Sequence, residues 1–175
     1  MQNKIILDTN VYGEILVEEN REELVKKIKE DKSSVIYGVD IIEEELSETP
    51  SEIKYKGKEL KKLLIDLFET ISKEIINITP LAKYLAEDYF RRYKKLSKTK
   101  KYNINKEKYS EKNLKIDFEI LAIASLNSID IVVSSDIRTM LSQISKDICK
   151  YINNQNKLRT PRLLDYKSFK ENLAK

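Results

Sequence analysis

The sequence predicts an α/β fold, a helix-rich three-layer α/β/α sandwich around a central, mainly parallel sheet of four to five strands. The strand-like runs are short, β-branched and almost continuously apolar, as in parallel strands that are covered on both faces. Segments with helical periodicity alternate with these runs, and that alternation is typical of a parallel sheet. With 3 glycines and 3 prolines, the chain has few residues that would break a helix.

Each expected strand is a run of mostly Ile, Val and Leu. The expected strands are residues 4–8, 34–38, 75–78, 130–134 and 162–164, of which 75–78 carries the weakest pattern. The expected helices follow from apolar residues spaced three and four apart. The first helix is expected after Asn10 and the last after residue 164. The helices between them are expected at 21–30, 40–46, 58–72, 80–96 and 113–128. Thr79 is the expected N-cap before Pro80.

The length and composition suit one globular domain. A chain of 175 residues with 41% hydrophobic content can build a sizeable core. We expect a single domain over 1–175, with a basic insertion at about 91–113 and a C-terminal extension at about 150–175. Cys149 is the only cysteine, which excludes an internal disulfide. The N-terminus is too polar for a signal peptide and no run is long enough to span a membrane, so we expect a cytoplasmic protein.

The chain contains no histidine, and this excludes several kinds of catalysis. Ser-His-Asp and Cys-His nucleophiles, histidine-ligated zinc and histidine acid–base pairs are all impossible. An enzyme with this sequence must therefore work through carboxylates, lysines, tyrosines or a bound cation.

Acidic residues follow two of the expected strands. Asp8 ends the first strand, and Asp136 follows "DIVVSS". Ligands of parallel α/β sheets bind beyond the carboxyl ends of the strands. If these two strands are neighbours, the two carboxylates converge at one edge of the sheet.

Two further acids can reach this edge from helices. Asp117 precedes an apolar stripe in "KIDFEILAIAS", so we expect it on the inward face of its helix. The helix after the second strand carries three successive acids, Glu43, Glu44 and Glu45. Glu45 follows the inward-facing Ile42 by three residues and is the best placed, while Glu44 remains an alternative.

One interpretation of Asp8, Asp117 and Asp136 is that each merely caps a helix. Four acids at one edge are nevertheless hard to explain as independent caps, because close carboxylates repel unless a positive charge lies among them. An all-oxygen site suits Mg²⁺ or Mn²⁺, and such an ion can assist attack of water on a phosphodiester. The small polar neighbours would hydrogen-bond to the carboxylates or the phosphate. These neighbours are Thr9, Asn10, Ser134 and Ser135.

Four segments resemble the ordered motifs of PIN domains, including the VapC-type toxins. They are "IILDTNVY", the glutamate of "IIEEELS", "IDFEILAIAS" and "DIVVSSDIRTM". The resemblance implies a metal-dependent nuclease that acts on RNA, with Asp8, Asp117 and Asp136 as metal-binding and catalytic residues. The helical acid of the family usually precedes a leucine, which favours Glu45 over Glu44. The resemblance also implies a possible small antitoxin partner and a homodimer.

A strongly basic segment precedes Asp117. Residues 91–115 contain eleven Lys and Arg (91, 92, 94, 95, 98, 100, 101, 106, 108, 112 and 115) against two glutamates, Glu107 and Glu111. Tyrosines lie between these cations at 93, 102 and 109, a combination that suits single-stranded nucleic acid. The alternative is a solvated loop that confers solubility. The candidate RNA-binding residues are Arg91, Arg92, Lys94, Lys95, Lys100, Lys101 and Tyr102.

Three functions are compatible with these patterns. The first is a metal-dependent endoribonuclease, as part of a toxin–antitoxin pair or in RNA processing. The second is a non-catalytic PIN-like domain that binds RNA or protein. The third, a phosphatase-like hydrolase with Asp8 as covalent nucleophile, is disfavoured because "LDTN" lacks the second aspartate of such enzymes.

Overall fold

A computed structural model describes residues 2–99, 102 and 110–173, and its centre is a five-stranded parallel sheet. The strand order is β5-β2-β1-β6-β7, and every neighbouring pair is parallel. The strands are β1 (Asn3–Leu7), β2 (Ser34–Val39), β5 (Ile75–Ile76), β6 (Ile131–Ser134) and β7 (Arg162–Asp165). The predicted sheet is thus confirmed, with β1 at its centre.

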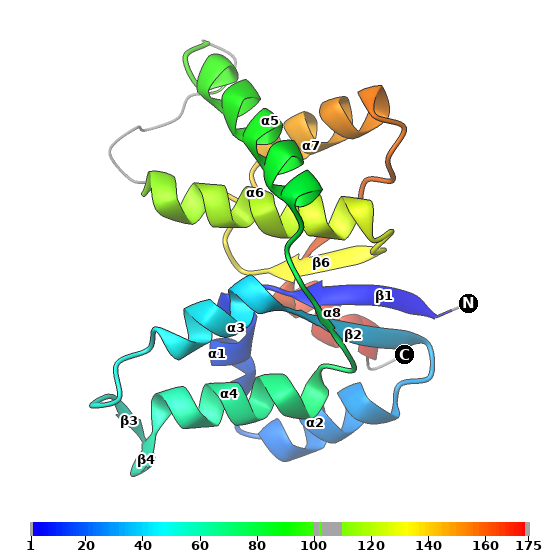
Figure 1. Ribbon diagram of the computed structural model, residues 1–175. Helices are drawn as coiled ribbons and strands as arrows, with labels where there is room; N and C mark the ends of the chain where they lie inside the picture. The colour runs from blue at the N-terminus through cyan, green and yellow to red at the C-terminus, as the bar shows by residue number, and fades with distance from the viewer. Residues whose placement is uncertain (1, 100–101, 103–109, 174–175) are drawn as a thin grey trace.

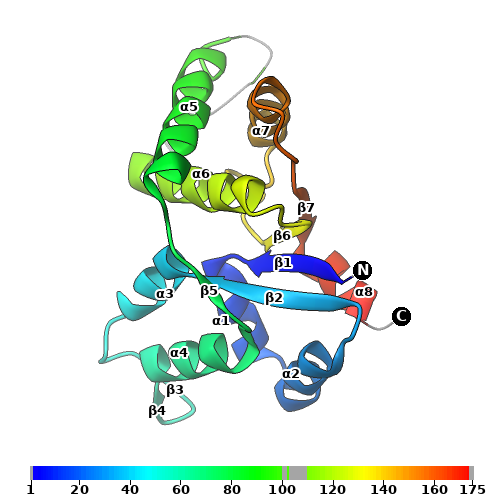
Figure 2. The ribbon, with the colours of Figure 1, turned by 45° about the vertical axis from the view of Figure 1, so that its right-hand side comes forward.

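Helices cover the sheet on both faces, which makes the fold a three-layer α/β/α sandwich. Figures 1 and 2 show α5, α6 and α7 on one side of the sheet and α1, α2, α4 and α8 on the other. The helices are α1 (Thr9–Val17), α2 (Arg21–Glu30), α3 (Asp40–Ser47), α4 (Leu60–Ile71), α5 (Pro80–Leu96), α6 (Glu111–Leu126), α7 (Gln143–Gln155) and α8 (Tyr166–Leu173). No described helix is long and apolar enough to cross a membrane.

The two helical layers bury the inner residues of the two central strands. Ile6 and Leu7 of β1 and Val132 and Val133 of β6 have no exposed surface. Consecutive residues point to opposite faces of a sheet, so burial of neighbours requires cover on both faces. The continuous apolar runs of the sequence therefore reflect the sandwich.

Three elements differ from the sequence-based expectations. Residues 54–59 form a hairpin of β3 (Lys54–Tyr55) and β4 (Lys58–Glu59), so α4 begins at Leu60 instead of residue 58. Gly57 lies in this turn with a φ of 80°, a value that glycine adopts without strain. Strand β5 ends at Ile76, and α7 was not predicted.

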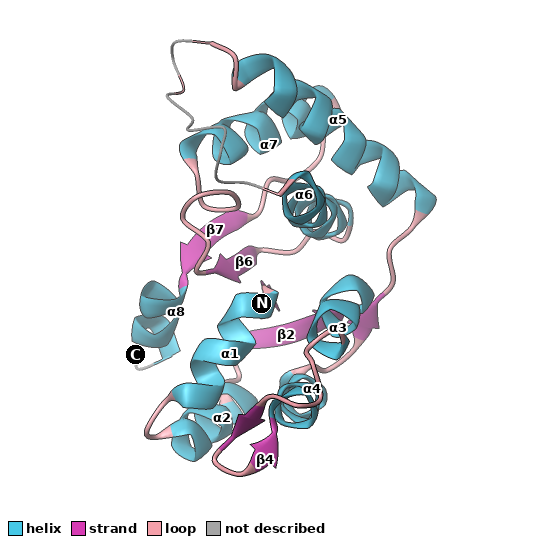
Figure 3. Cartoon of the chain, turned by 90° about the vertical axis from the view of Figure 1, so that its left-hand side faces the viewer, coloured by secondary structure: helices cyan, strands magenta, loops and turns pink. Residues whose placement is uncertain are grey.

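The chain path brings the carboxyl ends of β1 and β6 side by side. Leu7 pairs with Val133, and the amide of Asp8 donates to the carbonyl of Val133 at 2.8 Å. Figure 3 shows α3 and α6 end-on near the start of α1, where β1 ends. Side chains from β1, β6, α3 and α6 can therefore meet at this edge.

Candidate functional site

Asp8 lies at the end of β1 and is 4% exposed. One carboxylate oxygen accepts from the amide of Thr9 at 2.8 Å, which makes Asp8 the N-cap of α1. The other oxygen accepts from the hydroxyl of Ser134 and from the Asn10 side-chain amide, both at 2.6 Å. Asp8 is thus a helix cap and also the centre of a hydrogen-bond network that joins β1 to β6.

Asn10 and Ser134 complete this connection between the two strands. The Asn10 carbonyl oxygen accepts from the amide of Ser135 at 2.9 Å. The Ser134 hydroxyl accepts from the amide of Asp136 at 3.0 Å. Ser135 therefore takes part through its backbone, and no hydrogen bond of its hydroxyl is found within the described residues.

Asp136 follows β6 and is held by the loop that it begins. One oxygen accepts from the amides of Arg138 and Thr139, at 2.8 and 2.9 Å. The other accepts from the Thr139 hydroxyl at 2.6 Å. Asp136 thus caps the turn after β6 and not a helix, because the next helix, α7, begins only at Gln143.

Asp117 is different, because it lies inside α6 and caps no helix. It is 9% exposed, and its Oδ2 is buried without a hydrogen-bond partner in the described part of the chain. The helix-cap interpretation is therefore wrong for Asp117. A buried carboxylate oxygen without a donor is costly, so this atom needs an explanation.

Glu45 joins the site through Thr9. The Thr9 hydroxyl donates to Oε2 of Glu45 at 2.5 Å, which connects α3 to α1. Glu44, the alternative, is exposed and interacts electrostatically with Glu119 of α6. The structure thus places Glu45, and not Glu44, beside the other acids.

The four acids influence one another electrostatically. Burial raises the pKa of Asp117 to about 8, and repulsion from Asp8, Asp136 and Glu45 adds to the rise, while Thr139 opposes it. Burial also raises the pKa of Asp8 to about 6, against the hydrogen bonds from Ser134, Thr9 and Asn10. Negative charge is therefore concentrated at this edge and poorly compensated by protein groups.

The donor set fits a hard divalent cation. All the candidate ligand atoms are oxygens, and Oδ2 of Asp117 is without a donor. Within the described residues, no three Asp, Glu or Cys side chains are already arranged to hold one ion together. Occupation would therefore require the carboxylate side chains to rearrange.

Thr139 is a site residue that the sequence analysis did not identify. It is 4% exposed, binds Asp136 through both its amide and its hydroxyl, and lowers the pKa of Asp117. A threonine three residues after a strand-ending aspartate is a recognisable turn pattern. That spacing is the signal that could have revealed it.

The first part of the basic segment belongs to α5. Arg91 pairs with Asp88 at 2.7 Å, and Lys94 pairs with Glu111 of α6 at 3.3 Å. Arg92 packs over the ring of Tyr151. Lys95 is exposed. The predicted contacts of Lys100, Lys101 and Tyr109 fall outside the described residues.

The proposed role of the interleaved tyrosines needs correction. Tyr93 is 7% exposed and packs edge-on against Phe118, so it is a core residue and cannot stack on a base. Its position on the inward face of α5, with Tyr89 and Phe90, explains this burial. The hydroxyl of Tyr102 donates to Asp147 at 2.6 Å, so this side chain is tied to α7.

Comparison with solved structures identifies the fold. No protein-family model matches the chain, and no curated protein matches its sequence. The chain is similar to a chain in the crystal structure of VapBC2 from Rickettsia felis bound to a DNA fragment from their promoter. The similarity covers 93% of this chain and 98% of that one, with a TM-score of 0.53 and 16% identity. The chain thus has the PIN-like fold, and the resemblance seen in the sequence is confirmed at the level of the fold.

Proposed function

We propose that the protein is a metal-dependent endoribonuclease that hydrolyses RNA phosphodiester bonds and serves as the toxin of a toxin–antitoxin pair. The observation that carries the proposal is the buried, unpartnered Oδ2 of Asp117 beside three other acids. In a chain without histidine, a cation at these carboxylates is the available route to phosphodiester hydrolysis.

Four side chains would hold the cation. They are Asp8, Glu45, Asp117 and Asp136, all of which supply oxygen ligands. When bound, Mg²⁺ or Mn²⁺ supplies positive charge that stabilises the scissile phosphate and promotes ionisation of the attacking water.

The protein's own polar groups position these acids. Asn10 and Ser134 hold one oxygen of Asp8, and Thr9 orients Glu45. Thr139 plays the same part for Asp136. Such supporting hydrogen bonds keep carboxylates in place before the substrate arrives, and losing one typically lowers metal affinity or activity by about 10–100-fold.

The proposed partners follow from the fold and the charge distribution. The similar chain belongs to a VapBC2 assembly, which supports a small antitoxin protein as a partner here. We also propose that the protein forms a homodimer and that it is cytoplasmic. A third proposal is that the cationic start of the basic segment, Arg91 to Lys101, contacts RNA. Phosphate contacts of this kind weaken as salt concentration rises.

Cleavage of a labelled single-stranded RNA tests the proposal. We expect cleavage with Mg²⁺ or Mn²⁺, none with chelator, and a loss of more than about 100-fold in Asp8→Asn and Asp117→Asn. Glu45→Gln should also reduce cleavage strongly, because it removes a ligand charge. Rates from gel-resolved fragments provide the measurement.

Glu44→Gln is the matched control, because Glu44 is the exposed neighbour of Glu45 on the same helix. It should cleave at the wild-type rate. Metal-independent cleavage, or full activity in Asp117→Asn, would contradict the proposal. RNA binding without cleavage under any metal condition would support the non-catalytic alternative instead.

A further inference from the structure

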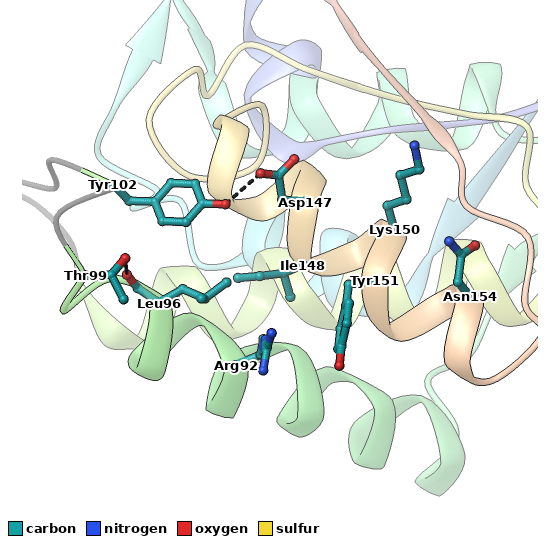
Figure 4. A pocket seen from close by; sticks show the side chains of 9 residues that line it. All are labelled: Arg92, Leu96, Thr99, Tyr102, Asp147, Ile148, Lys150, Tyr151 and Asn154. Carbon is teal, nitrogen blue, oxygen red and sulfur yellow. Dashed lines mark hydrogen bonds between the residues drawn. The ribbon is translucent and has the colours of Figure 1, made fainter.

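A groove of about 570 Å³ lies between α5 and α7, apart from the acidic site. Leu96 and Ile148 form an apolar floor, with Ile148 completely buried. Figure 4 shows Tyr102 at one end of the groove and Asn154 at the other, with Arg92 and Tyr151 between them. The groove thus combines an apolar floor with aromatic and polar walls.

Arg92 and Tyr151 form a stacked pair in this groove. The guanidinium carbon of Arg92 lies 4.4 Å from the centre of the Tyr151 ring. Nε of Arg92 is buried without a hydrogen-bond partner within the described residues, so the protein leaves hydrogen-bonding capacity of this guanidinium unused. Stacking on an aromatic ring orients the planar guanidinium of an arginine, so that its N–H groups can donate to a phosphate or a carboxylate.

The charges around the groove favour an anionic ligand. Arg92 and Lys150 are cations, and Lys150 forms no ion pair in the described part of the chain. Among the described lining residues the one acid is Asp147, whose oxygens already accept from Tyr102 at 2.6 Å and Gln143 at 2.7 Å. The lining therefore offers free donors to a ligand and few free acceptors.

We propose that this groove binds one nucleotide of a single-stranded nucleic acid. The base stacks against the Tyr151–Arg92 pair over the apolar floor, and the adjoining phosphate binds Arg92 and Lys150. Tyr151 is 46% exposed, so part of its ring is available for stacking. The inference rests on the proposed function, which already assigns Arg92 to an RNA-binding segment, and adds a defined place where one nucleotide binds away from the four acids.

An acidic peptide with an apolar side chain is the rival occupant. Arg92, Leu96, Thr99 and Tyr102 of the groove belong to the basic segment. Within 91–115 there are eleven Lys and Arg against two acids, an excess of nine positive charges. Such an excess attracts a polymer with a negative charge on every repeating unit, as a nucleic acid has on every nucleotide. Aromatic faces in such a setting favour nucleobases, because every base can stack.

Binding of a fluorescein-labelled 12-nucleotide RNA, followed by fluorescence anisotropy in chelator, tests the proposal without cleavage. We expect Tyr151→Ala to weaken binding about tenfold and Tyr151→Phe to retain it, because stacking requires only the ring. Arg92→Gln should weaken binding to a similar degree and make it less dependent on salt. Circular dichroism melting verifies that each variant is folded.

Two controls match these substitutions outside the groove. Tyr84→Ala removes a 74% exposed tyrosine of α5, and Lys26→Gln removes an exposed cation of α2. Both should bind RNA within twofold of the wild type. Equal loss in Tyr84→Ala and Tyr151→Ala, or wild-type affinity in Tyr151→Ala, would overturn the proposal, as would Tyr151-dependent binding of an acidic peptide but not of RNA.

The outcomes separate this inference from the proposed function. Tyr151-dependent RNA binding with no metal-dependent cleavage would uphold the groove and reject the ribonuclease. Asp8-dependent cleavage with unchanged binding in folded Tyr151→Ala and Arg92→Gln would do the reverse.

Discussion

Asp117 is the most unusual of the four acids, Asp8, Glu45, Asp117 and Asp136, which together are called the acidic edge below. It lies within α6, buried among the apolar residues of that helix, and has no donor for Oδ2 in the described structure. Three other acids repel its charged form. A cation would relieve both the missing hydrogen bond and the repulsion, so in the proposed metal site Asp117 would couple ion binding to stability.

The pH dependence of stability follows from this burial. The pKa of Asp117 is about 8 in the folded protein, above the ordinary value of 3.8. Between these two values the folded state binds more protons than the unfolded state, so the contribution of Asp117 to stability falls as pH rises from about 4 to about 8 and is constant above that range. We therefore compare the free energies of unfolding of Asp117→Asn and wild type without metal. The difference in favour of the variant should be larger at pH 9 than at pH 5, by about 1.4 kcal/mol or more.

Urea denaturation of wild type and Asp117→Asn in chelator, at pH 5 and pH 9, measures this difference. Titrating groups that do not interact with Asp117 contribute equally to both proteins, so their effects cancel in the comparison. A stability difference that is the same at both pH values would contradict a raised pKa. Glu44→Gln, which neutralises an exposed acid, should change little at either pH.

Single-residue predictions from the sequence succeeded where local geometry determines position. Asp8 and Asp136 end apolar strands, and parallel strands bring such ends together. The helical phase of Asp117 correctly indicated burial. Thr139 was missed because it lies in a turn, where its spacing of three residues from Asp136 is the signal, and the periodicity of helices and strands does not report such a spacing.

At the scale of elements, strand β2 approaches helix α4 so closely that one position admits no side chain. A Cβ on Gly38 would lie 2.6 Å from the tip of the buried Phe68 ring and 3.2 Å from the Ser72 hydroxyl. The Phe68 ring also packs against Tyr12 of α1, at 5.5 Å between ring centres, and is fully buried. It therefore has little room to move.

We expect Gly38→Ala to lower the free energy of unfolding by about 1–3 kcal/mol through overpacking. Gly13→Ala is a matched control, because Gly13 lies within α1 and a Cβ there meets no atom within 4 Å. That substitution should stabilise the protein by about 0.5–1 kcal/mol, since alanine favours helix more than glycine. Equal effects of the two substitutions in urea denaturation would refute the proposed close contact.

The sequence predicted most elements because their patterns are strong, and the misses have physical reasons. Helix α7 was left unassigned although Ile144, Ile148 and Ile152 repeat at helical spacing and are buried. Its many polar residues weakened the pattern. The 54–59 hairpin was missed because its strands have two residues each, too few to show alternation.

At the scale of the whole molecule, helix α8 is linked by side-chain contacts to the end of helix α1. The Tyr166 hydroxyl of α8 donates to Glu18, the residue that follows α1, at 3.0 Å, and Lys170 pairs with the same carboxylate. Tyr166 and Phe169 are buried, with exposures of 8% and 2%. Helix α8 thus completes the layer that also contains α1.

Truncation after Asp165 should destabilise the protein by at least about 3 kcal/mol, because it exposes the surface that two aromatic side chains cover. Thermal and urea unfolding measure the loss. In the full-length chain, Lys170→Ala should cost less than about 1 kcal/mol, because its ion pair is partly exposed. A truncated chain as stable as the full chain would show that α8 is dispensable.

The position of β1 also has a consequence for synthesis on the ribosome. Asp8 is made well before Ser134, whose hydroxyl donates to its carboxylate and which lies 126 residues later in the chain. Contacts over such separations form late and slowly, and β1 lacks one neighbouring strand until β6 has emerged. A nascent chain therefore cannot bring the four acids together before β6 and Asp136 have been made, and a product that stops before Asp136 never does so.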